Sequence, residues 1–185
     1  MTPRLIDLLC ERHQMLVVDT RAWPEQQGSC QHCNHDDDSF VTLPDLPLLR
    51  TLAVHEAGHA VVHLTQGTPV DSVELTGLRG SVQIGGDGTQ WLEGVLAGPG
   101  AVTMLAERHG LTAPADVVDA VWTGLFDFQM LYEQGCGEEI ERFISPADRL
   151  VAEHWRAIER VADAVLARGT LTGSEIAELA GCGVS

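Results

Sequence analysis

The stretch from Asp45 to Gly67 constrains the fold most, because it is long, rich in apolar residues and bounded by helix signals. Asp45 can cap a helix, Pro47 suits the first turn, and Gly67 is a typical stop. Apolar residues recur between these signals at helical spacing and predict one buried stripe. They are Leu49, Leu52, Ala53, Ala57, Ala60, Val61 and Leu64. We therefore expect the chain to fold around a central helix.

The rest of the chain alternates between helical and extended patterns. We expect a helix, or a helix followed by a strand, over 4–18, and two strands within 70–84 that turn near Leu78, Arg79 and Gly80. The remaining elements are expected to be helical: one from about Thr89, two over 114–133 and 145–168, and a last one near Ser174. Gly98, Pro99 and Gly100 should kink or break the helix that contains them. The sequence therefore predicts a mainly α fold that carries a small β-hairpin.

The length of 185 residues suits one domain with a short appendage. Residues 22–47 are loop-like, because they hold prolines, a glycine and the acidic run from Asp36 to Asp38. We therefore divide the chain into an N-terminal extension over 1–47 and a helical domain over 48–185.

Composition argues against several classes of function. The net charge is −16, from 27 acidic against 11 basic residues, which disfavours nucleic acid and anionic membrane surfaces as partners. All 11 basic residues are arginine, so the chain has no lysine for Schiff-base chemistry or for a phosphate-binding loop. No apolar run reaches the length of about 20 residues that spans a bilayer, and the amino end does not resemble a secretory signal. We expect a cytoplasmic protein without a membrane partner.

His55, Glu56 and His59 form an H-E-x-x-H motif on the central helix. Residues four apart lie one turn apart on the same helix face, so both imidazoles can bind one zinc ion at about 2.0–2.1 Å. Glu56 lies beside the metal-bound water and can take its proton as general base. Two incidental histidines are the alternative, but a polar triplet in an apolar helix needs a reason. The motif therefore predicts a catalytic zinc site.

A catalytic zinc site needs a third protein ligand and an open fourth position. His63 continues the line of His55 and His59 but lies about 12 Å along the helix axis from His55, too far to share the metal easily. We interpret His63 as a polar residue on the flank of the helix. Spacing leaves the third ligand open among six carboxylates. They are Glu74, Glu93, Glu107, Asp116, Asp119 and Asp127.

Four segments resemble, in the same order, parts of the peptidase domain of FtsH-type AAA+ zinc metalloproteases. TLAVHEAGHAVVHLTQGTPVDSVEL is similar to the HEAGHA helix and the strand that follows it. WLEGVLAGPGA is similar to the family's LAGRAAEE, TGLFD resembles TGASND, and VLARGTLTGSEIAEL resembles LLEKETLDGEEI. The resemblance covers roughly residues 48–180 and implies a helical, zincin-like peptidase domain. It implies that His55 and His59 bind zinc, that Glu56 is catalytic and that Asp127 completes the metal site.

The chain departs from this family at two points. Val102 and Thr103 stand where the family has paired glutamates, so these positions lack the carboxylates that would support the metal. The family's AAA+ module and membrane anchor have no counterpart in the sequence. We therefore expect a peptidase without its own ATPase, acting on short or unfolded polypeptides or on substrates presented by a separate unfoldase or adaptor. The family forms hexamers partly through the ATPase, so the resemblance does not determine whether this chain forms a homo-oligomer.

A second cluster of candidate ligands lies in the N-terminal extension. Cys30 and Cys33 are spaced as C-x-x-C, with His32 between them and His35 shortly after. Such a cluster can bind zinc or act in redox chemistry, with completion by upstream residues or by a second subunit. No second C-x-x-C closes the site, so a polar loop with free thiols is the other interpretation.

The sequence therefore predicts a zinc-dependent metalloendopeptidase that works without its own ATPase. A catalytically degenerate FtsH-like domain, acting as a protein-interaction module with a structural zinc, is the first alternative. The second is a metallohydrolase that acts on another polarised carbonyl. The strands within 70–84 bind an extended peptide at the sheet edge or merely cover the core, and the sequence does not distinguish these roles.

Overall fold

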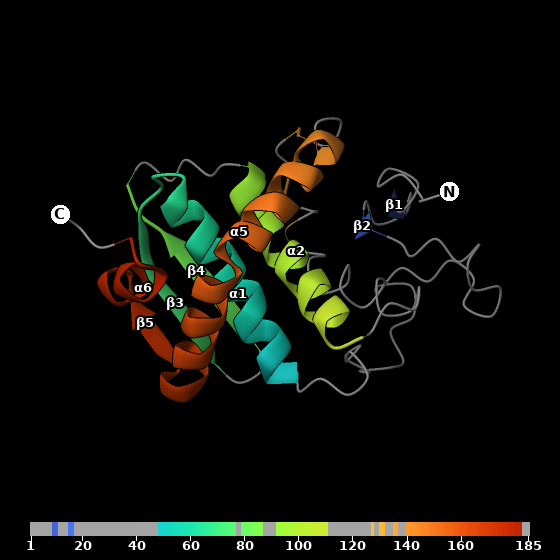
Figure 1. Cartoon of the computed structure of the whole chain (residues 1–185). Coiled ribbons are helices and arrows are strands. Elements are labelled where there is room, and N and C mark those ends of the chain that lie inside the picture. The colour runs from blue at the N-terminus through green and yellow to red at the C-terminus, as the bar shows by residue number, and fades with distance from the viewer. Residues whose placement is uncertain are drawn as a thin grey trace.

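Figure 1 shows the computed structural model of the chain. The structure describes residues 9–10, 15–16, 48–76, 79–86, 92–110, 127, 130–131, 135–136 and 140–182. This part of the chain is mainly helical, with four helices and a small three-stranded antiparallel sheet. The predicted fold class is therefore confirmed. No helix in these ranges combines the length and the apolar character that crossing a membrane requires.

The elements are β1 (Leu9–Cys10), β2 (Met15–Leu16), α1 (Leu48–Thr65), β3 (Val70–Thr76), β4 (Arg79–Ile84), α2 (Leu92–Arg108), α5 (Ile140–Arg168), β5 (Thr170–Thr172) and α6 (Gly173–Ala180). β1 and β2 pair with each other antiparallel, so Leu9 and Cys10 form a strand where the sequence predicted a helix. A short isolated helix is marginal in water, whereas pairing satisfies the same backbone groups between strands. Most of the extension over 1–47 and most of the helix predicted over 114–133 lie outside the described residues.

The central helix α1 ends as the sequence predicts. Gly67 has a φ of 81°, and its N–H donates to the carbonyl of Leu64 at 3.0 Å. The N–H of Thr68 donates to the carbonyl of His63 at 2.9 Å, so the two bonds close the helix as a Schellman motif. Glycine adopts this left-handed conformation without the steric cost that a Cβ would bring.

Burial of α1 is more extensive than the single stripe that the sequence predicts. Every residue from Ala53 to His63 is buried. α2 and α5 pack against α1, and the sheet contacts it from another side (Figure 1). Small residues permit this close approach, because a Cβ at Gly58 would lie 2.6 Å from the carbonyl oxygen of Ala97 on α2. The polar side chains between Ala53 and His63 therefore lie inside the protein and not on its surface.

Helix α2 continues through Pro99, although the sequence predicts a kink or a break there. Proline removes one backbone hydrogen bond and costs roughly 3 kcal/mol inside a helix. Packing outweighs this cost, because ten residues of α2 are buried between its neighbours. The hydroxyl of Thr103 also donates to the carbonyl of Pro99 at 3.1 Å. The prediction of a break is therefore wrong.

Helix α5 begins at Ile140, before the Ser145–Pro146 pair that the sequence marks as its start. Pro146 has the φ angle of a helix and forfeits only one backbone donor, so a helix can extend across it when tertiary contacts reward the extra turns. Ile140 supplies such a contact, because it is fully buried. α5 ends at Arg168, as predicted.

The sheet has the strand order β4-β3-β5. The hairpin prediction is confirmed, but β4 begins at Arg79, so Arg79 and Gly80 belong to a strand and not to the turn. The third strand β5 was not predicted, because three residues carry too little periodicity. Leu171 of β5 pairs with Val73 of β3, and both side chains are fully buried in the core. The chain then enters α6, close to the start predicted near Ser174.

Candidate metal centre

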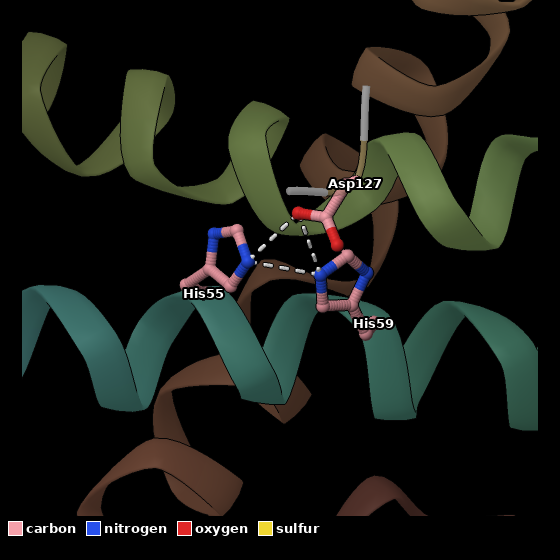
Figure 2. A group of neighbouring side chains, drawn as sticks. All are labelled: His55, His59 and Asp127. Carbon is pink, nitrogen blue, oxygen red and sulfur yellow. Dashed lines mark hydrogen bonds and ion pairs between the residues drawn. The ribbon is translucent and has the colours of Figure 1, made fainter. Parts of the chain in front are cut away.

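Helix α1 carries the two histidines of the H-E-x-x-H motif on one face (Figure 2). His55 and His59 are 5% and 8% exposed, and their rings meet edge to face with centroids 4.6 Å apart. The Nε2 atoms of the two rings are separated by 3.0 Å. This is the convergence that the four-residue spacing predicts.

Asp127 reaches the same point from a different segment of the chain (Figure 2). The backbone is helical at this residue. Its Oδ2 lies 3.0 Å from Nε2 of His55 and 3.3 Å from Nε2 of His59. A tetrahedral zinc ion with bonds of about 2.0–2.1 Å separates its ligand atoms by about 3.3 Å. The triangle of two nitrogens and one oxygen therefore has the size that one such ion needs. These three residues are the group in the described chain that can hold a metal ion.

A backbone contact orients the ring of His59. Its Nδ1 lies 2.9 Å from the carbonyl oxygen of Gly94 on α2, which can only accept a hydrogen bond. Nδ1 therefore carries a proton, and Nε2 is the nitrogen that faces Asp127 and His55. A histidine that binds a metal commonly has its other nitrogen held in this way. Nδ1 of His55 is buried and has no hydrogen-bond partner.

The Asp127 carboxylate interacts electrostatically with both imidazoles of the cluster. Burial by itself lowers the pKa of His59, but the Asp127 carboxylate, together with Glu56 and the hydrogen bond to Gly94, outweighs burial and raises that pKa to about 9. Burial would raise the pKa of Asp127, but His59 and His55 outweigh it and hold that pKa well below its usual range. A cation that binds here therefore replaces a proton on His59. The side chain of Asp127 is 20% exposed, so solvent reaches this side of the cluster.

Glu56 lies next to the cluster on the same helix and is 7% exposed. Burial raises the pKa of Glu56, whereas the nearby imidazoles of His55 and His59 favour its charged form. A Cβ at Gly80 of β4 would collide with the Glu56 carboxyl group, so strand and carboxyl group lie in direct contact. A carboxylate with a raised pKa beside a metal-ligand cluster can accept a proton and return it.

Two glycines of α2 make room for the imidazoles of α1. A Cβ at Gly98 would collide with the ring of His59, and a Cβ at Gly94 would collide with the ring of His63. Sequence reasoning missed the role of both glycines, although their spacing of four residues on one helix face was the available signal. The contact of Gly80 with Glu56 had no comparable signal, because it joins a strand to a helix.

His63 differs from its sequence interpretation as a flank residue. It is 2% exposed, and its Nδ1 has no hydrogen-bond partner. α2 covers this side of α1 because glycine occupies position 94, which leaves the space that the ring fills. Burial, with a smaller contribution from His59, lowers the pKa of His63 to about 4. A neutral imidazole at this position is not one of the three grouped ligands.

Three of the other sequence candidates lie in the described part of the chain, and they do not join the cluster. Glu74 and Glu107 are exposed and Glu93 is half-buried, and none of them belongs to the metal-ligand group. Val102 is fully buried in the core, where the family would have a glutamate. Outside the described residues lie Asp116, Asp119, Cys30, His32, Cys33 and His35.

No protein-family model matches the chain, and no curated protein sequence matches it. The resemblance of its motifs to FtsH-type peptidases therefore stays a prediction. The geometry of the site carries the functional argument.

Proposed function

We propose that the chain is a zinc-dependent metallopeptidase that hydrolyses peptide bonds in short or unfolded polypeptides without an ATPase of its own. One observation carries the proposal: two imidazoles and a carboxylate converge on one point with Glu56 beside them, at a buried and mostly apolar stretch of α1. Burying polar groups costs free energy unless they are partnered, so a cluster of this kind requires compensation. A metal ion supplies it.

The donor set together with Glu56 favours zinc. Two imidazole nitrogens and one carboxylate oxygen suit zinc or ferrous iron, whereas magnesium and calcium prefer oxygen ligands. A glutamate between the two histidines of an H-E-x-x-H motif is typical of hydrolytic zinc sites. Three protein ligands also leave a fourth position open, as in catalytic zinc sites. A bound zinc ion supplies a Lewis acid and a water whose pKa is lowered towards about 7.

The protein groups have distinct roles in this proposal. His55, His59 and Asp127 hold the metal, and the carbonyl of Gly94 keeps the His59 ring oriented. Glu56 accepts a proton from the attacking water and delivers it to the leaving amine, for which its buried position suits it.

The outer strand β4 is the proposed platform for the substrate. Its inner edge pairs with β3, and in the described part of the chain its other edge has no strand partner. Gly80 brings this strand into contact with Glu56. An extended peptide that adds to the free edge through main-chain hydrogen bonds therefore runs past the proposed catalytic carboxylate. This mode requires an unfolded segment, which favours short substrates or a separate unfoldase.

A protein-interaction module with a structural zinc is the second candidate function. It is favoured by Val102 and Thr103, because neither provides the carboxylate that the resembling family carries at that position. Thr103 instead bonds within its own helix. In this case the cluster holds zinc but catalyses nothing.

The experiment compares zinc content and hydrolysis of quenched fluorescent peptides for the wild-type chain, E56Q and E74Q. Glu74 is exposed on β3, so E74Q is a matched control for the change of charge. We expect about one zinc per chain in all three proteins, with turnover reduced by about 10²- to 10⁴-fold in E56Q alone.

Each contrary outcome has a definite meaning. Undiminished turnover in E56Q would refute the role of Glu56. Zinc binding by a wild-type chain that cleaves neither peptides nor unfolded casein would favour the interaction module. Cleavage of other amides or esters, but not of peptides, would favour a different metallohydrolase.

A further inference from the structure

The two faces of strand β4 differ sharply. Gly80, Val82 and Ile84 are half-buried, and the two apolar side chains pack against the core. The alternate residues, Arg79, Ser81 and Gln83, are exposed. Because successive side chains of a strand point to opposite faces, these three form the row that a strand added beside β4 would meet on the outer face.

Arg79 is the charged member of this row. Its cross-strand neighbour on β3 is Thr76, which is neutral. Glu74 lies on the same outer face, but it is paired with Ser81, so it is diagonal to Arg79. No ion pair joins Arg79 to any acidic side chain of the described residues. The guanidinium is therefore available to a ligand that lies along the outer edge of β4, which has no strand partner in the described part of the chain.

The position of Arg79 relative to Glu56 follows from the strand. Gly80, the next residue, contacts Glu56 on the inner face. Arg79 therefore projects to the outer face from the position just before the one that contacts the carboxyl group. A peptide that pairs with β4 so that its scissile bond meets Glu56 has a neighbouring side chain on the outer face. In adjacent strands such side chains lie about 4.5–5.5 Å apart at the Cβ atoms, within reach of an ion pair.

We propose that Arg79 is a specificity-determining residue, which selects an acidic side chain near the scissile bond of a peptide bound along β4. The inference rests on the proposed peptidase function and extends it to a substrate class. Ser81 and Gln83 continue the polar row, so further outer-face positions of the peptide favour polar side chains. The guanidinium offers the planar pair of donors that a carboxylate accepts.

The test uses quenched fluorescent decapeptides that are neutral except for one Glu, moved through each position in turn, with a matched Gln series. The measured quantity is the Glu-to-Gln ratio of kcat/KM at each position. For the wild-type chain we expect a ratio of about 2 to 5 at one position or at alternate positions, the size of a cross-strand ion pair. The ratio should fall towards 1 in 0.5 M salt, because exposed charges are screened.

Three variants decide the assignment. R79Q should bring the ratio to about 1, and R79E should invert it in favour of Gln. R156Q removes an exposed arginine of α5, which belongs to no strand, and should keep the wild-type ratio. Far-ultraviolet circular dichroism and zinc content establish that each variant is folded and loaded.

The failure of this inference is distinguishable from failure of the proposed function. Cleavage by R79E with the wild-type ratio at every position would overturn the role of Arg79 and leave the peptidase intact. Arg79 would then serve to disfavour pairing of β4 with a strand of another molecule, which is a common role of charged residues on edge strands. A wild-type chain that cleaves no peptide would overturn both.

Discussion

The metal-ligand cluster and the C-terminal turn are organised by opposite rules. In the C-terminal turn, the polar contacts join near neighbours in sequence. The hydroxyl of Thr172 accepts from the N–H of Glu175, whose side chain accepts from the N–H of Thr172 at 2.8 Å. Arg168 pairs with Glu175 at 2.6 Å, and Gly181 ends α6 in the left-handed conformation.

The cluster joins His55 and His59 to Asp127, which is distant from them in sequence, and buried polar atoms on and beside it have no hydrogen-bond partner. Nδ1 of His55 and Nδ1 of His63 are buried without a hydrogen-bond partner. Local rules are therefore met in the C-terminal turn, whereas buried polar atoms stay unsatisfied on α1 and at Nε1 of Trp155 on α5. Such violations persist in proteins mainly where function requires them.

The change expected to disturb the cluster most is D127N. The amide is a neutral, weaker ligand, so we expect the affinity for zinc to fall by more than about 100-fold. A competition titration with a chromophoric chelator measures this affinity. D163N, which removes an exposed carboxylate paired with Arg50, is the control and should leave it unchanged. Unaltered affinity in D127N would show that another carboxylate is the third ligand.

The second prediction concerns the pH dependence of stability in the metal-free protein. The pKa of His63 is about 4 in the folded chain against about 6.5 when unfolded, so the unfolded state binds more protons between these values. Stability should therefore fall as the pH drops from 6.5 to 4, by up to about 3 kcal/mol from this residue.

Chemical denaturation of the wild type and H63L at pH 7 and pH 5 measures this contribution. The difference between the two proteins isolates His63 from Glu56, whose raised pKa acts in the opposite direction. The acid-induced loss should be smaller in H63L. An equal loss in both proteins would mean that His63 is not the buried titrating group.

The third prediction contrasts two glycine-to-alanine changes, one in each region. G98A pushes the His59 ring out of position, so we expect zinc affinity to fall by about 10- to 100-fold. G181A strains the left-handed end of α6, and a Cβ there meets no atom. It should cost about 1 kcal/mol of stability and leave zinc affinity unchanged. Equal zinc affinity in the two variants would contradict the proposal that Gly98 leaves the space in which the His59 ring is held for metal binding.

The smallest effect is expected from T172A. Loss of the capping side chain should cost about 1 kcal/mol, which urea denaturation detects as a lower midpoint at an unchanged slope. Zinc content and turnover should not change, because the cap lies outside the cluster. A loss of zinc in T172A would show that the two regions are coupled.

Much of the fold could be predicted from the sequence because its signals are local. The ends of α1 at Gly67 and of α5 at Arg168 follow from short-range rules, and so does the hairpin of β3 and β4. Two of the errors arose at prolines. Pro99 and Pro146 both lie inside helices, because burial of neighbouring residues outweighs the single backbone hydrogen bond that each forfeits.

The sequence by itself determined the pairing of His55 with His59 and the position of Glu56, because residues four apart always share a helix face. Only the tertiary structure decided which carboxylate meets these histidines, since spacing left six candidates. It also decided that Gly94 and Gly98 leave the space for the rings of His63 and His59, and that His63 is buried and neutral. These outcomes depend on how α2, the segment of Asp127 and β4 pack around α1. Packing between distant segments has no periodic signature along the chain.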